Sequence, residues 1–230
     1  MALDEIIAKV TAAKASNSGT IYLTSDNLEL VCRALRKHHG RKLTESHLSE
    51  LIFQEYVKRS DVDRETFMRT YRVVFHSWGL YYFEDGRFYF TKMLIDYING
   101  DCNYSDIIET ICVKWQYPKP QQQTQPSGPL RPMVALLKVM NSLKKSELSS
   151  RLTHAECNLF VMFISSDNEI EEFIDLLVEY RKDDEYINVE LKKRSIEIKT
   201  NGLESGIERM IWYLKKANAI SDRDGIIEVL

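Results

Sequence analysis

GLYYFEDGRFYF, residues 79–90, is the stretch that decides the fold. Two aromatic runs flank the tetrapeptide Glu84-Asp85-Gly86-Arg87, and aromatic residues favour β-strands. An Asp-Gly pair between two such runs is the strongest short-range signal for a β-hairpin, because both residues tolerate the positive φ of a tight turn. The sequence therefore predicts two short antiparallel strands that turn at Asp85 and Gly86.

Helical patterns precede this hairpin. A short amphipathic helix is expected at about residues 2–14. Ser25 and Asp26 are N-cap candidates for the next helix, which we expect to end at Gly40. Its apolar residues have helical spacing: Leu28, Leu30, Val31 and Leu35.

Two further helices complete the approach to the hairpin. Thr44 opens one of them, and residues 61–63 cap another that runs to about Trp78. We call this last one the third helix, counting from the helix at Ser25, and one of its faces is apolar: Phe67, Tyr71, Val74, Phe75 and Trp78. More helices are expected from Thr91 and over 105–115. Three helices followed by a hairpin is the order of elements in a winged helix.

A proline- and glutamine-rich stretch, PKPQQQTQPSGPLRP at residues 118–132, interrupts the apolar pattern and has the composition of a linker. We therefore expect a first subdomain at residues 1–117, a linker or exposed loop at 118–130 and a second subdomain at 131–230. Each half is long enough to hold its own hydrophobic core.

The second half repeats the theme of the first. Helices are expected at 131–142, 144–151, 153–164, 168–182 and 201–219. The segment 186–199 alternates like short strands, and Asp224-Gly225 between short apolar runs predicts a terminal hairpin. The sequence therefore predicts a mainly α fold with small β-hairpin wings, arranged as two tandem winged-helix-like subdomains.

The composition argues against several classes of protein. The formal net charge is −3 and the pI is about 6.0, which argues against a protein that coats DNA through bulk positive charge. The sequence has no apolar run of transmembrane length and no basic-then-apolar start typical of a secretory signal, so we expect a cytoplasmic protein. The cysteines lack the close pairs of zinc sites, and we expect reduced, packed thiols and no metal ligand.

The segment Lys114-Trp115-Gln116-Tyr117-Pro118 resembles the KWQYP segment of the AlwI-like restriction endonucleases and related nicking enzymes. A similar aromatic-proline segment closes the first subdomain of the BpuJI-type recognition domain. The order downstream is similar as well, with a helix at 131–138, Leu152-Thr153 before an apolar helix, and the segment 168–180. The resemblance implies a recognition region made of winged-helix subdomains that is non-catalytic by itself. A separate nuclease domain would use Mg²⁺.

The third helix holds the first set of candidate DNA-contacting residues. Its side opposite the apolar face carries Arg64, Thr66, Arg69, Thr70 and Arg72. Arginine is the preferred bidentate reader of guanine, and threonine meets a thymine methyl group or a phosphate. The alternative is a solvated helix face whose charges only stabilise the helix.

Other candidates lie outside that helix. The densest basic run contains Arg36, Lys37 and Arg41, which suits phosphate contacts but also a helix C-terminus that favours cations. Arg87 at the first hairpin turn is a candidate for a minor-groove or phosphate contact. The outward side of the last helix is expected to offer further candidates, although its charges are mixed: Ser205, Arg209 and Tyr213.

Catalysis has weak support in the sequence. Glu190-Leu191-Lys192 and Glu197-Ile198-Lys199 match the acid-x-lysine element of magnesium-dependent nucleases, but a helical second half leaves no room for the sheet they need. No Walker A, Gly-x-Ser-x-Gly or His-Glu-x-x-His motif occurs. We therefore expect a monomeric module that reads double-stranded DNA, with a winged-helix transcription regulator or protein-interaction module as the alternative.

Overall fold

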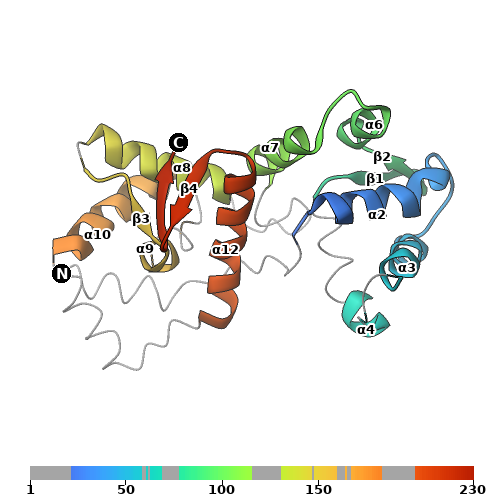
Figure 1. Cartoon of the computed structure of the whole chain (residues 1–230), viewed down its shortest axis with the longest axis horizontal. Helices are drawn as coiled ribbons and strands as arrows, with labels where there is room; N and C mark the ends of the chain where they lie inside the picture. The colour runs from blue at the N-terminus through green and yellow to red at the C-terminus, as the bar shows by residue number, and fades with distance from the viewer. Residues whose placement is uncertain are drawn as a thin grey trace. The chain divides into compact units, whose positions relative to one another are not determined.

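The computed structural model describes residues 22–58, 61, 63–68, 78–115, 131–146, 148–159, 164, 167–182 and 200–230. The chain packs as two compact units (Figure 1). We call Ser18–Ile111 the N-terminal unit and Cys112–Leu230 the C-terminal unit. The described residues are mainly helical with two small antiparallel sheets, which confirms that part of the predicted fold class.

Three predicted segments lie outside the described residues: the helix at 2–14, the linker at 118–130 and the strand-like run at 186–199. The predicted subdomain boundaries at 117 and 131 stay a prediction. In the described parts of the chain, no helix has the length and apolar content needed to cross a bilayer.

The first described helices form a packed pair. Helix α2 spans Ser25–Leu35 and helix α3 spans Glu45–Tyr56. The α2 cap is Thr24 rather than the predicted Ser25 or Asp26, because Thr24 has extended backbone and its hydroxyl accepts from the Asn27 amide at 3.2 Å. Buried side chains fix the contact between the helices: Leu28, Leu30, Val31, Leu35, Leu48 and Ile52.

Only the start of the predicted third helix is described. A short helix, α4, spans Arg64–Thr66, and Phe67 follows it with a fully buried side chain. The Phe67 ring lies against Phe53 and Tyr56 of α3, with ring centroids 5.1 Å and 5.6 Å away. Phe67 therefore faces the core, as its place in the predicted apolar stripe requires. Residues 69–77 lie outside the described residues.

The predicted hairpin at 79–90 is confirmed. Strand β1 spans Tyr81–Glu84 and strand β2 spans Arg87–Phe90, and Glu84 pairs with Arg87 across the turn. Asp85 and Gly86 have φ values of 50° and 71°, the left-handed pair that such a two-residue turn requires. The side chains of Tyr81, Phe88 and Phe90 point into the core of the unit.

Two helices follow the hairpin. Helix α6 spans Lys92–Asn99 and ends at Gly100, whose φ of 83° is left-handed. Helix α7 spans Tyr104–Lys114, close to the prediction of 105–115. Buried apolar residues fasten both helices to the unit: Leu94, Ile107, Ile108 and Ile111.

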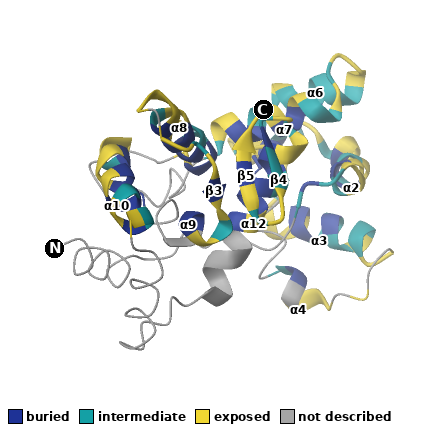
Figure 2. Ribbon diagram, turned by 60° about the vertical axis from the view of Figure 1, so that its left-hand side comes forward, coloured by how far each residue is buried: buried dark blue, intermediate teal, exposed yellow. Residues whose placement is uncertain are grey.

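The C-terminal unit begins with helix α8, Pro132–Lys145, followed by strand β3, Leu152–Thr153, and helix α9, His154–Leu159. A short 3₁₀ turn, η5 at Asp167–Glu169, leads into helix α10, Ile170–Lys182. The helix predicted at 144–151 is wrong, because α8 continues to Lys145 and residues 148–151 are non-helical. Helices α8 and α10 each have one buried and one exposed side (Figure 2).

The unit closes with helix α12, Thr200–Lys216, and a hairpin of strands β4, Ile220–Arg223, and β5, Ile226–Val229. Asp224 and Gly225 form its turn with φ values of 52° and 76°, which confirms the predicted terminal hairpin. Strand β5 lies between β3 and β4 in a three-stranded sheet. Helix α12 packs against β4, α9 and α8, so more than one of its sides is covered (Figure 1).

The two hairpins share more than a turn sequence. Gly79 and Asn218 have left-handed φ values of 64° and 53°, and each lies two residues before the first strand of its hairpin. In each unit the connection between two helices also pairs with the second hairpin strand, through Lys42 with Arg87 and through Thr153 with Ile226. These features support the predicted divergent repeat.

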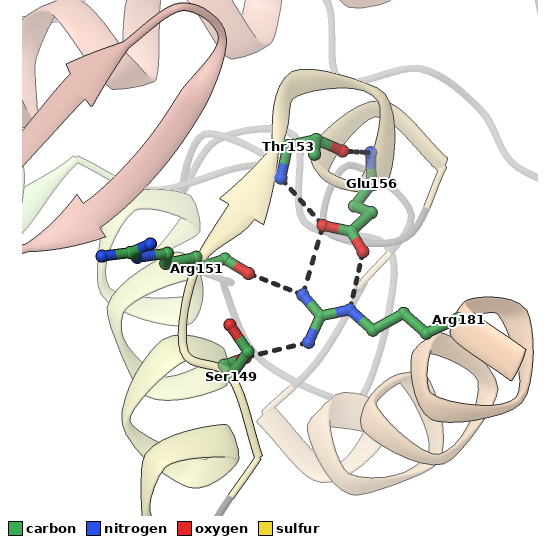
Figure 3. A network of polar contacts seen from close by, with 5 residues as sticks. All are labelled: Ser149, Arg151, Thr153, Glu156 and Arg181. Carbon is green, nitrogen blue, oxygen red and sulfur yellow. Dashed lines mark hydrogen bonds and ion pairs between the residues drawn. The ribbon is translucent and has the colours of Figure 1, made fainter.

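A polar network fixes strand β3 within the C-terminal unit (Figure 3). Arg181 of α10 donates to both carboxylate oxygens of Glu156, at 2.7 Å and 3.2 Å, and to the carbonyls of Ser149 and Arg151. Glu156 also accepts from the Thr153 amide, while the Thr153 hydroxyl accepts from the Glu156 amide. This reciprocal capping box starts α9, and Arg181 ties it to α10.

The Arg181→Ala substitution is expected to lower the free energy of unfolding by about 3 kcal/mol, because it leaves the buried Glu156 carboxylate without its cation. Lys182→Ala is the matched control. Lys182 is the next residue on α10, its ion pair with Glu179 is exposed, and its removal should cost less than about 0.5 kcal/mol. Denaturant unfolding measures both variants, and equal destabilisation would contradict the assignment.

Candidate nucleic-acid interface

The densest basic run lies at the end of α2 and against the first hairpin. Arg36 and Lys37 are in a 3₁₀ turn, η1 at Arg36–His38, and both side chains are exposed. Gly40 then takes a left-handed φ of 75°, which turns the chain towards strand β2. The Gly40 amide donates to the Phe88 carbonyl at 2.7 Å, and the Phe88 amide donates to the Arg41 carbonyl at 3.0 Å.

Arg87 joins the same surface from the hairpin side. Its Nη1 donates to the Gly40 carbonyl at 2.9 Å, and Lys42 is its bridge partner on the neighbouring segment. The structure therefore brings together two groups of candidates that the sequence kept apart. We call this set of exposed cations the basic surface: Arg36, Lys37, Arg41, Lys42 and Arg87.

The pKa of His38 is affected by this concentration of positive charge. Partial burial lowers the pKa of His38, and the neighbouring Arg41, His47 and Lys37 lower it further. A histidine whose pKa falls below its usual range is neutral at neutral pH. The basic surface therefore takes its charge from arginine and lysine, and it disfavours one more positive charge.

The third-helix candidates are only partly described. Arg64 lies at the start of α4, where its guanidinium contacts Glu50 of α3 at 2.9 Å and 3.0 Å. This exposed ion pair contributes little to stability. Thr66 is the last residue of α4. Three more candidates, Arg69, Thr70 and Arg72, lie outside the described residues.

The candidates on the last helix need correction. Arg209 is 4% exposed and Tyr213 is 2% exposed, so the prediction that they face outward is wrong. The physical reason is the position of α12, which packs against β4, α9 and α8 and so buries more than one of its sides. Ser205 lies in α12, but its side chain is outside the described residues. Glu208, Lys215 and Lys216 are the exposed charged residues of this helix among those whose side chains are described.

The sequence prediction missed an aromatic pair beside the basic surface. Tyr82 and Tyr89 face each other across the hairpin, with Tyr82 44% exposed. The alternation of strand residues could have identified them, since Tyr81, Phe88 and Phe90 point inward and leave Tyr82 and Tyr89 on the other face.

The described residues offer little for metal chemistry. They contain no group of three or more His, Cys, Asp or Glu side chains placed to hold a metal ion. Burial raises the pKa of Cys32 to about 11 and also raises the pKa of Cys157, which keeps both as thiols at neutral pH. The acid-x-lysine triplets at 190–192 and 197–199 lie outside the described residues.

The Arg41→Gln substitution is expected to raise the pKa of His38 towards its ordinary value, because removal of a nearby cation favours the charged imidazolium. An NMR titration of the His38 ring protons measures this change. Lys58→Gln, in the same unit but paired with Glu55, is the control that should leave the titration of His38 unchanged. An unchanged titration in Arg41→Gln would show that the two groups do not interact.

Comparison with known proteins gives a match to one family model and matches to solved structures. Residues 80–217 match the family model of the AlwI restriction endonuclease. The fold is similar to that of the BpuJ1 endonuclease binding domain, seen in a crystal structure with pyrene- and phenanthrene-modified DNA. That similarity has a TM-score of 0.65 at 13% identity and covers 96% of this chain and 82% of the other. No curated protein matches the sequence. Because the family model spans more than half of the sequence, the chain belongs to the AlwI restriction endonuclease family.

Proposed function

We propose that this chain is the sequence-specific, double-stranded DNA recognition module of a type II restriction endonuclease and is non-catalytic by itself. The observation that carries the proposal is the basic surface. Backbone hydrogen bonds hold Arg41 and Arg87 on adjoining segments, although 46 residues separate them in the chain. A cluster of cations held on and beside a small hairpin is suited to phosphate contacts that position a protein on DNA.

The net charge of −3 is compatible with this function. Affinity for phosphates depends on how many lysine and arginine side chains reach them, and not on the total charge of the protein. The basic surface gathers five of these side chains within residues 36–42 and 87. The proposed interface is therefore a local feature of the N-terminal unit.

The proposed architecture is a pair of winged-helix-like subdomains. In both units a helix, a short edge segment, two or more further helices and a hairpin follow in that order, and the edge segment pairs with the second hairpin strand. This order and pairing are typical of winged helices. The BpuJ1 endonuclease binding domain has a similar fold and was crystallised with DNA, which supports the same ligand class for this chain.

In this proposal the third helix contacts the bases and determines the sequence preference. The sequence pattern gives Arg69 and Thr70 mid-helix positions opposite the buried stripe to which Phe67 belongs. Arg64, Thr66 and Arg72 extend that side, and Ser205 is a candidate in the second subdomain. A separate nuclease domain with Mg²⁺ would then cut the DNA.

A selection on a random duplex library, at about physiological salt and first without Mg²⁺, tests the function. We expect enrichment of one short motif and no cleavage when Mg²⁺ is added. Cleavage by this chain would overturn the non-catalytic assignment and direct attention to residues 190–192 and 197–199. Absence of any enriched motif would favour a protein-interaction module.

Neutralising the cations that bind phosphates should reduce the salt dependence of binding. The triple variant Arg36→Gln, Lys37→Gln, Arg41→Gln is expected to lower the slope of log K against log salt by about 0.9 for each phosphate that the variant no longer binds, with sequence preference unchanged. Fluorescence anisotropy over a salt series measures the slope. The control is Lys144→Gln with Lys145→Gln, exposed cations at the end of α8 that should leave the slope unchanged.

A further inference from the structure

The outward face of the first hairpin carries an aromatic pair. Tyr82 of β1 and Tyr89 of β2 are cross-strand partners, and their rings are stacked with centroids 5.5 Å apart and planes 23° apart. Tyr82 is 44% exposed and Tyr89 is half-buried. An aromatic pair that is partly open to solvent therefore lies on the side of the hairpin opposite Tyr81, Phe88 and Phe90, and we call it, with His39, the aromatic surface.

The hairpin geometry does not require these tyrosines. The second hairpin has the same Asp-Gly turn and the same register, and Ser221 and Glu228 occupy its corresponding pair. Glu228 forms an exposed ion pair with Arg151, as is usual for a solvent-facing strand position. Since the same turn and pairing form without aromatic residues, the outward-facing tyrosines call for an explanation other than folding of the hairpin.

His39 extends the aromatic surface. Its ring meets Tyr89 edge-on, with centroids 5.6 Å apart and planes at 87°. The Phe90 amide donates to His39 Nδ1 at 3.2 Å, so the neutral imidazole carries its proton on Nε2. His39 is exposed and thus adds a hydrogen-bond donor at the edge of the tyrosine pair.

The aromatic surface is continuous with the basic surface along the chain. His39 and Arg41 flank Gly40, whose carbonyl accepts from Arg87, and Arg87 lies two residues before Tyr89 on the outward face of β2. The turn carries two acidic side chains, Glu84 opposite Arg87 and Asp85. The basic surface has five cations, so positive charge is in excess here. The net positive charge complements a nucleic-acid backbone.

We propose that Tyr82 and Tyr89, with His39 at their edge, form a stacking platform for an unpaired nucleobase of single-stranded DNA next to the bound duplex. Aromatic side chains that stack bases beside a positive groove are the usual means of holding single strands. Inside a duplex both faces of a base are covered by the neighbouring base pairs, whereas an unpaired base has a free face, so the platform selects unpaired DNA. This inference rests on the proposed DNA-binding function for the phosphate contacts, but it concerns different residues.

The test compares three probes of one sequence: a blunt duplex, the same duplex with a single-stranded overhang that contains 2-aminopurine, and the single strand alone. The wild-type chain is expected to bind the overhang duplex about tenfold more tightly than the blunt duplex and to quench the 2-aminopurine fluorescence. Tyr82→Ala should abolish both effects and leave the affinity for the blunt duplex unchanged. Tyr82→Phe should retain both effects, because stacking needs the ring and not the hydroxyl group.

Ile226→Ala is the matched control, since Ile226 is also 44% exposed and lies on the second hairpin. Thermal unfolding of Tyr82→Ala shows whether the hairpin stays folded, and Tyr89→Phe provides a second conservative variant. Equal wild-type affinity for blunt and overhang duplexes overturns the stacking platform while leaving duplex recognition intact. A third outcome is that the chain binds the single strand in a Tyr82-dependent way but does not bind the blunt duplex. This result supports the platform and overturns duplex recognition. No binding of any probe overturns both.

Discussion

The backbone pairing between residues 40–43 and the first hairpin is the interaction on which the N-terminal unit depends. An isolated two-stranded hairpin is marginal in water, and three hydrogen bonds from this connection give it a third, short edge: Gly40 to Phe88, Phe88 to Arg41 and Leu43 to Gly86. The same bonds fix the end of α2 and the start of α3 against the hairpin. They also place the cations of residues 36–42 beside Arg87, so the element that completes the sheet also builds the basic surface.

The C-terminal unit meets the same requirement with different chemistry. Its edge strand β3 is only two residues long, and pairing with β5 alone leaves the preceding segment unsupported. Arg181 supplies the support by binding the carbonyls of Ser149 and Arg151 together with the Glu156 carboxylate. Charge-assisted hydrogen bonds of this kind are stronger than neutral ones, so one side chain can hold a strand, a helix start and a loop.

Local signals explain what could be predicted from the sequence. The Asp-Gly turns act through their own φ preferences, so both hairpins were predictable without knowledge of the rest of the chain. Strand β3 was not predictable, because two residues carry no periodicity and the strand exists only through its pairing with β5. Arg209 and Tyr213 were misplaced for a related reason: an amphipathic pattern assumes one covered side, whereas α12 is covered by three elements. The basic surface also needed tertiary pairing, since residues 36–42 and 87 meet only through the sheet.

Comparison of the two units separates the backbone features that both hairpins share, which we call the frame, from the side chains that differ between them. Both units have left-handed residues before and within the hairpin. In both, the residue after the turn glycine pairs with the edge segment, and these features define the frame. The outward positions differ completely, with Tyr82 and Tyr89 in one hairpin and Ser221 and Glu228 in the other. A substitution at a frame position changes stability, whereas these outward pairs can vary without disturbing the pairing beneath them. Outward side chains that occur in only one of the two hairpins are therefore the best candidates for contacts with a ligand of that unit.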